Sequence, residues 1–260
     1  MKRENIERIA QTPEDKLLLA KLWDKINGAI LRDIPANTCF LSPREQSMAQ
    51  FLFGDYPGLF FFGGYDTATR KMLVYLPEYM DEASLYDTPP MACIRASFYA
   101  GDSLSHRDFL GALMGAGIAR EAVGDILVDK ESCDFFVTEE LVPYLLQSFD
   151  SAGRSKLRLE QIGLQDANIP EPEIQEVKDT LASLRLDSVI SSGFRISRSA
   201  AADFITAGKA VLNGLQCEKP DKAVEAGAVI SVRTKGKIKL EHIGSPTKKG
   251  RIPVVIHRYL

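Results

Sequence analysis

Apolar residues in the first part of the chain recur at helical spacing. Residues 12–15 combine a capping side chain, a proline and two acids, which together start a helix. Leu18, Leu22 and Ile26 follow at intervals of four and indicate the buried face of that helix. A similar start signal predicts a second helix over residues 42–53, which ends before a glycine.

Two β-rich runs follow these helices. Residues 59–65 and 71–77 contain mainly aromatic and aliphatic side chains, and a short polar turn separates them. This pattern is typical of a β-hairpin. Together with the helices it predicts a small N-terminal αββ lobe over residues 1–80.

The next stretch has the element order of a split βαβ unit, which predicts a central ferredoxin-like, RRM-like βαββαβ domain over residues 81–164. The expected strands and helices cover residues 93–99, 105–114, 125–128, 133–138, 139–149 and 156–162. The third strand lacks the basic-glycine-aromatic pattern that presents stacking rings to RNA bases. We therefore expect Phe135 and Phe136 to pack in the core.

The remaining chain predicts a linker and a third domain. Residues 165–182 begin with a polar, proline-bearing stretch that suits a stiff linker. Residues 183–260 then predict two short helices, a tight turn at Asn213 and a small curled sheet. A segment with Lys248, Lys249 and Arg251 precedes the final strand. The predicted fold class is α+β.

Charge is divided unevenly along the chain. Residues 185–260 contain fourteen Lys and Arg against six Asp and Glu, a net charge of +8. The whole chain has a net charge of -3, so residues 1–184 carry -11. A basic module of this kind can neutralise phosphates, whereas the acidic part suits a protein partner or solubility.

The cations are placed around the two C-terminal helices. Arg185 opens the first helix, Arg195 and Arg198 flank the start of the second, and Lys209 follows its end. Backbone N–H groups in the first turn beside Arg198 attract anions. Asp187 binds phosphate unfavourably, so we expect it to orient Arg185 or Arg198. The alternative is that these residues are ordinary solvated surface charges.

A set of motifs spans Ser183 to about Leu240. It comprises Arg185-Leu186-Asp187, Ser197-Arg198, Ala201-Ala202, Ile205, Gly208, Val211, Asn213-Gly214, Gly227, Ile230-Ser231-Val232-Arg233 and Gly236. This set resembles the RNA-binding domain named after small-subunit ribosomal protein S-four. It departs at Ala228 and Thr234, where the family usually has Asp and Gly.

Further motifs lie upstream of this domain. They include Phe40-Leu41-Ser42-Pro43-Arg44-Glu45-Gln46, Gly64-Tyr65, Arg70-Lys71-Met72, Leu104-Ser105-His106-Arg107-Asp108 and Gly124-Asp125-Ile126. With them, the chain resembles the YlmH family of bacterial ribosome-associated proteins nearly end to end. This resemblance implies a cytoplasmic protein that binds ribosomal RNA of the large subunit carrying an obstructed peptidyl-tRNA. It also implies a role in ribosome-associated quality control and alanine tailing, while the older family label is cell division.

The resemblance implies that Arg185, Ser197, Arg198, Lys209 and Asn213 face RNA. The charge pattern adds Arg195, Arg233, Lys235 and Lys237. In the central domain, a second candidate RNA contact comprises His106, Arg107 and Arg120. The expected partners are ribosomal RNA, peptidyl-tRNA and quality-control factors, and we expect a monomer that contacts no membrane.

The sequence contains few candidate catalytic residues, so we expect a protein that is not an enzyme and needs no metal or cofactor. No acid or cysteine lies at useful spacing from the three histidines, and the four cysteines lie far apart. The S-four-type domain accompanies pseudouridine synthases and methyltransferases, and Arg185-Leu186-Asp187 resembles a synthase triplet. However, too little chain follows it for a catalytic domain. An RNA-modifying enzyme and a protein-interaction adaptor remain the alternatives.

Overall fold

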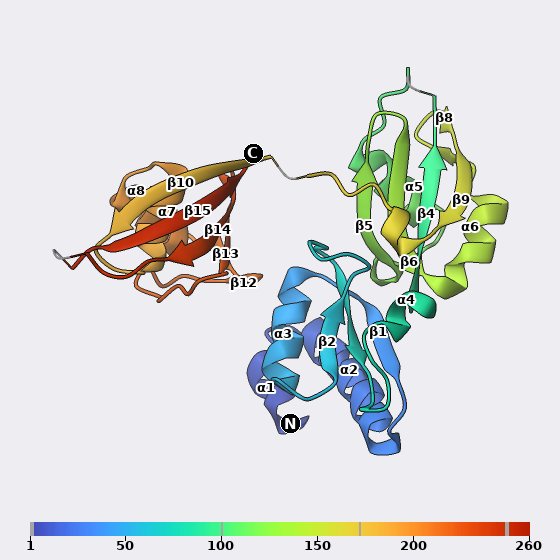
Figure 1. Cartoon of the computed structure of the whole chain (residues 1–260), viewed down its shortest axis with the longest axis horizontal. Coiled ribbons are helices and arrows are strands. Elements are labelled where there is room, and N and C mark those ends of the chain that lie inside the picture. The colour runs from blue at the N-terminus through green and yellow to red at the C-terminus, as the bar shows by residue number, and fades with distance from the viewer. Residues whose placement is uncertain (1–2, 100, 172, 248–249) are drawn as a thin grey trace. The chain divides into compact units, whose positions relative to one another are not determined.

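The computed structural model describes residues 3–99, 101–171, 173–247 and 250–260. The chain forms two compact units, Met1–Pro170 and Glu171–Leu260 (Figure 1). Lys248 and Lys249, which were predicted to precede the final strand, lie outside the described residues.

Unit 1 begins with helices packed on a three-stranded antiparallel sheet of order β1-β3-β2 (Figure 1). The elements are η1 (Arg3–Asn5), α1 (Ile6–Ile9), α2 (Pro13–Arg32), β1 (Ala36–Leu41), α3 (Pro43–Phe53), β2 (Leu59–Phe62), β3 (Lys71–Tyr75) and α4 (Ser84–Asp87). The predicted helix starts and the predicted hairpin are present, and Thr12 and Ser42 each form a capping box. Strand β1 was not predicted, because its first half contains Asn37 and Thr38 and its partner β3 comes from a distant part of the chain.

The second half of unit 1 has the predicted βαββαβ order, with an antiparallel sheet of order β5-β6-β4-β9. Its elements are β4 (Met91–Ser97), α5 (His106–Gly115), η2 (Arg120–Ala122), β5 (Val123–Val128), β6 (Ser132–Thr138), η3 (Glu139–Leu141), α6 (Val142–Ser148), β7 (Ser151–Ala152), β8 (Ser155–Lys156), β9 (Arg158–Ile162) and η4 (Leu164–Asp166). Phe135 packs on the face covered by α5 and α6. Phe136 points to the opposite face and is fully buried.

The face that carries Phe136 shares a core with the N-terminal lobe. Phe40, Phe62 and Met72 of the lobe belong to the same buried cluster as Phe136. A Cβ at Gly64 would lie 2.7 Å from the Phe136 ring, so only glycine allows this approach. The sheet face on which RRM domains stack bases is therefore occupied here by the lobe, at the end where Phe136 lies.

Hydrogen bonds also join the lobe to β5. The Asp125 carboxylate accepts from the Tyr65 hydroxyl at 2.7 Å and from the Thr69 and Arg70 amides at 2.6 and 3.0 Å. The Arg70 guanidinium donates to the carbonyls of Val123 and Phe40 at 2.9 Å. These contacts fix the loop between β2 and β3 against the central sheet.

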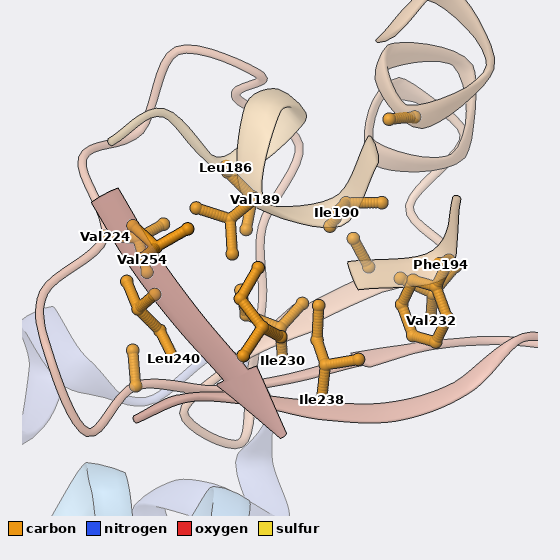
Figure 2. Close-up of a cluster of buried hydrophobic side chains, with 14 of the residues drawn as sticks. Leu186, Val189, Ile190, Phe194, Val224, Ile230, Val232, Ile238, Leu240 and Val254 are labelled. Carbon is orange, nitrogen blue, oxygen red and sulfur yellow. The ribbon is translucent and has the colours of Figure 1, made fainter. Parts of the chain in front are cut away.

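Unit 2 contains two helices on one face of a six-stranded antiparallel sheet of order β10-β15-β14-β13-β11-β12 (Figure 1). The elements are β10 (Ile174–Leu181), α7 (Leu186–Phe194), α8 (Arg198–Thr206), β11 (Ala210–Leu212), β12 (Leu215–Gln216), β13 (Val229–Val232), β14 (Gly236–Ile243) and β15 (Ile252–Tyr259). Side chains of α7 point toward those of the strands and form the core with them (Figure 2).

Strand β10 corrects the prediction of a linker over residues 165–182. It pairs with β15 along its whole length, from Ile174 opposite Tyr259 to Leu181 opposite Ile252. At the other end of the predicted linker, Ala167 and Ile169 pack against the core of unit 1. An edge strand covered on one face needs few apolar residues, so its polar sequence looked like a linker.

Within the described ranges, no helix combines the length and apolar character needed to cross a bilayer.

Candidate nucleic-acid interface

A buried carboxylate holds two of the predicted RNA-facing arginines in unit 2. Arg185 donates to Asp187 through Nε and Nη2 at 3.2 and 3.0 Å. From α8, Arg198 Nη2 donates to Asp187 Oδ1 at 3.2 Å, and its Nε lies 3.2 Å from Oδ2. The expectation that Asp187 orients Arg185 or Arg198 is therefore met for both residues.

This cluster keeps a positive charge at the surface. The Asp187 side chain is 6% exposed, whereas those of Arg185 and Arg198 are 40% and 53% exposed. Burial by itself would raise the pKa of Asp187, but the hydrogen bonds from Arg185 and Arg198 together outweigh it and hold that pKa below its ordinary value. Two cations and one anion leave a net positive charge, and each guanidinium has donors that Asp187 does not use.

The backbone of the loop before Ala223 supports the start of α7. The amides of Leu186 and Asp187 donate to the carbonyls of Lys222 and Pro220 at 2.8 and 3.0 Å. The exposed residue Lys222 is thereby placed beside Arg185. Lys222 was not predicted from the sequence, because only the tertiary fold brings its loop to α7.

The turn between α7 and α8 contains two more predicted residues. Arg195 is exposed and ends α7 with a φ of 54°, at the opposite end of that helix from Arg185. Ser197 caps α8 and accepts a hydrogen bond from the Ala200 amide at 3.1 Å. Ser197 thus starts the helix at whose first position Arg198 lies.

A second basic cluster surrounds the half-buried ring of Phe204. The ammonium groups of Lys209 and Lys235 lie 5.9 and 5.8 Å from the ring centroid, within the range of cation–π attraction. The Arg233 amide donates to the Lys209 carbonyl at 2.9 Å, which joins the two segments. Lys209, Arg233 and Lys235 are all exposed.

The two remaining predicted residues of unit 2 have different surroundings. Asn213 has a φ of 48°, and its Oδ1 accepts from the Val229 amide at 2.8 Å, so it shapes the turn between β11 and β12. Lys237 lies 4.6 Å from the centroid of the Tyr259 ring. Because Ile238 points into the core below α7, Lys237 points to the opposite face of the sheet.

One cation of the final strand was not singled out from the sequence. The Arg258 guanidinium lies 5.7 Å from the centroid of the Phe194 ring at the end of α7. It therefore adds a positive charge on the helical face, at the end where Arg195 lies. The sequence alone does not show the position of Arg258, because that position depends on the register between β14 and β15.

The residues of the second candidate RNA contact do not lie together. His106 and Arg107 are exposed in the first turn of α5. The turn at Gly153 lies beside the start of that helix, because a Cβ added at Gly153 would lie 3.6 Å from the Leu104 side chain. That turn also contains the exposed residue Arg154, which was not predicted from the sequence.

Arg120 has a structural environment elsewhere in unit 1. Its Nη1 donates to the carbonyls of Val123 and Gly124 at 2.6 and 3.3 Å. Burial and the neighbouring Arg70 lower the pKa of the Arg120 guanidinium. These contacts connect Arg120 to the junction of the lobe and β5.

Comparison with known proteins places these features in a family. A relative from Bacillus subtilis (strain 168), named "Ribosome-associated protein quality control protein P2", is 34% identical over 223 residues, which cover 85% of this chain and 86% of the relative. Residues 99–166 match the family described as "Putative RNA-binding domain in YlmH". The chain belongs to the YlmH family.

Two further matches describe parts of this YlmH-family chain. Residues 184–230 match the S4 domain, which includes α7, α8 and their basic clusters. The solved structure "Cell division protein ylmH from Streptococcus pneumoniae" is 21% identical, covers 60% of this chain and 96% of that chain, and aligns with a TM-score of 0.49.

Three of the four thiols of this YlmH-family protein are poorly suited to nucleophilic chemistry. Burial raises the pKa of Cys93 to about 12 and also raises the pKa values of Cys39 and Cys133. These three side chains are therefore protonated near neutral pH. Among the described residues, no group of three or more His, Cys, Asp or Glu side chains is arranged to hold a metal ion.

Proposed function

We propose that this protein is a non-catalytic RNA-binding factor that associates with the large ribosomal subunit in the bacterial cytoplasm. We further propose that it acts as a monomer on subunits carrying an obstructed peptidyl-tRNA, together with quality-control factors in alanine tailing. The main support is the pair of exposed arginines on the buried Asp187 carboxylate, within a segment that matches the S4 domain. The name of the Bacillus subtilis relative supports the ribosomal setting.

Phosphate contacts would supply most of the affinity. The exposed donors of Arg185 and Arg198 are held in place before binding, so less conformational entropy is lost when a phosphate arrives. Arg195, Lys209, Arg233, Lys235, Lys237 and the turn residue Asn213 extend the proposed contact around this pair. If about five phosphates are neutralised, the logarithm of affinity falls with that of salt concentration at a slope of about -3.5 to -4.5.

RNA shape, rather than stacked bases, would determine the specificity. The sheet face that carries stacking rings in RRM domains holds the buried Phe136 here. In the central domain we propose a smaller contact through His106 and Arg107, to which Arg154 is added by position. Arg120 would lie outside this contact, because it holds the carbonyls of Val123 and Gly124.

Co-sedimentation with ribosomal subunits tests the proposal. The intact chain should travel with large subunits bearing peptidyl-tRNA, whereas a variant with Arg185, Arg198 and Lys209 changed to Ala should stay at the top of the gradient. A matched control changes Arg8, Lys21 and Lys25 to Ala, three exposed cations of unit 1 that give the same change in net charge. This control should sediment like the intact chain.

Three outcomes would contradict the proposal. Equal loss of binding in both variants would mean that net charge, not this cluster, controls association. Binding that survives ribonuclease treatment would favour a protein-interaction adaptor. Failure of the intact chain to bind subunits with or without peptidyl-tRNA would remove the ribosomal role.

A further inference from the structure

The N-terminal lobe carries an open groove that includes none of the candidate RNA-facing residues. Its volume is about 750 Å³, within the range of about 300–1,000 Å³ that is usual for binding pockets. The end of α2, the loop before β2, the end of β3 and the segment at residues 77–82 form its walls.

Aromatic and apolar side chains form the inner surface of this groove. The rings of Tyr56 and Tyr75 lie 6.4 Å apart between centroids, at an angle of 56°. Met80 lines the same space. Beside it, Tyr79 donates from its hydroxyl to the Asp33 carbonyl at 3.0 Å and is 66% exposed, so aromatic surface continues beyond the groove.

Four exposed carboxylates also line the groove, at Asp33, Glu78, Asp81 and Glu82. Among the described lining residues there is no lysine or arginine to balance them. Within the same part of the chain, none of the four forms an ion pair. A cation entering the groove would therefore meet uncompensated negative charge.

The end of α2 increases this negative potential. Asp33 caps the C-terminus of the 20-residue helix, with a φ of 52°. Helix C-termini carry partial negative charge and favour cations, so an acid at this position is unfavourable by itself. Burial, followed by the charge of Asp33, raises the pKa of the Tyr75 hydroxyl, which donates to Asp33 Oδ1 at 3.3 Å.

We propose that this groove binds an extended, arginine- or lysine-bearing segment of a partner protein. A basic side chain would lie against the accessible part of the Tyr56 ring and pair with carboxylates of the groove, among them Asp33 and Glu78, gaining cation–π and ionic attraction together. The apolar part of the segment would cover Tyr79. Recognition of a protein segment in an aromatic-lined groove is a common binding mode.

The charge of the groove disfavours RNA, because four carboxylates repel phosphates. The exposed ring of Tyr79 favours a protein segment over a free polyamine, which has no side chains to cover it. The two units would then bind oppositely charged partners, and the groove does not depend on the RNA-binding proposal.

Fluorescence anisotropy of the full-length protein with a short labelled peptide of arginine, proline and leucine tests the proposal. The groove variant combines Asp33→Asn, Glu78→Gln and Glu82→Gln, and asparagine tolerates the left-handed backbone at position 33. The control variant combines Glu131→Gln, Glu139→Gln and Glu140→Gln, three exposed acids elsewhere in unit 1. Both variants change the net charge equally.

We expect the groove variant to bind the peptide about tenfold more weakly than the control variant, from the loss of three partly exposed ionic contacts. Tyr56→Ala should also weaken binding, and the citrulline version of the peptide should bind poorly to the intact protein. Equal binding by the two charge variants, or absence of saturable binding to the intact protein, would overturn the proposal. Displacement by spermine as effective as that by unlabelled peptide would show a site for small cations instead.

Discussion

Asp187 and Arg198 connect the two helices of unit 2, because Asp187 Oδ1 accepts a hydrogen bond from Arg198 Nη2 at 3.2 Å across eleven positions of the chain. The acid is buried and the base is half exposed. An acidic residue can therefore favour RNA binding by setting the direction of its cationic neighbours.

Asp187→Asn tests this role directly. The change adds a positive charge to the protein, which by itself would strengthen binding to RNA. If Asp187 orients the arginines, affinity should instead fall about tenfold, the effect of losing one charge-assisted hydrogen bond. Asp203→Asn, an exposed acid on α8, gives the same charge change as a control. Filter binding to large-subunit RNA measures both, and similar affinities for the two variants would contradict the orienting role.

Arg198 should contribute about one unit to the salt dependence of RNA binding. Arg198→Ala should weaken binding and flatten the slope by that amount. Arg198→Lys should retain the slope but lose affinity, because an ammonium group cannot reproduce the planar fork between Asp187 and a phosphate. Affinity measured across a salt series gives both quantities. An unchanged slope in Arg198→Ala would remove this residue from the interface.

The Phe204 ring should strengthen RNA binding without touching RNA. It attracts Lys209 and Lys235 from opposite segments, so Phe204→Leu should free both lysines while keeping an apolar side chain in place. Two exposed cation–π contacts correspond to about a three- to tenfold loss of affinity. Phe204→Tyr keeps the π face and should bind like the original protein. Equal affinity in the Leu and Tyr variants would contradict this view.

The ion pair between α2 and α3 should make unit 1 sensitive to acid. Hydrogen bonds from Arg44 outweigh burial and lower the Asp15 pKa from 3.8 to about 2. The corresponding stabilisation, about 2 kcal/mol, is present above pH 4 and disappears as the pH falls through about 2. Asp15→Asn should thus lower the free energy of unfolding at pH 7, and the difference should narrow between about pH 4 and pH 2. Denaturant titrations across this pH range measure both free energies of unfolding. A difference between the two proteins that stays constant with pH would contradict the prediction.

Thr234 should be a site of backbone strain in the turn before β14. It has a φ of 74°, which a β-branched residue rarely adopts. Thr234→Gly should raise the free energy of unfolding by about 1 kcal/mol, since glycine adopts this region without steric cost. Thr234→Val should not stabilise the protein. Thermal unfolding of the two variants separates release of strain from loss of the hydroxyl.

Local signals were sufficient to predict most helices and the general location of the basic site. Each helix cap, at Thr12, Ser42 and Ser197, lies directly before the helix that it starts. Asp187 pairs with Arg185 two positions away. Strands β1 and β10 could not be predicted this way, because their stability comes from distant partners.

Long-range contacts also determine which cations lie together. Lys209 and Lys235 are far apart in sequence but meet at Phe204, and Lys222 reaches α7 through a loop. Conversely, Lys237 follows Lys235 closely yet has a different neighbour, because Lys235 lies in the turn before β14, whereas Lys237 lies within β14 and pairs opposite Tyr259. Charge in a sequence therefore predicts a basic domain more reliably than it predicts a binding surface.

The segment that matches the RNA-binding family and the compact unit that contains it have different boundaries, because unit 1 has a shared core. The match covers residues 99–166, but strand β4 (Met91–Ser97) lies between β6 and β9 and precedes that range. A fragment cut at residue 99 would lack an inner strand, and one cut at residue 81 would leave Met91, Cys93 and Phe136 without their partners in the lobe. The segment that matches the RNA-binding family is thus smaller than the compact unit, and the whole of Met1–Pro170 is the piece to express and study alone.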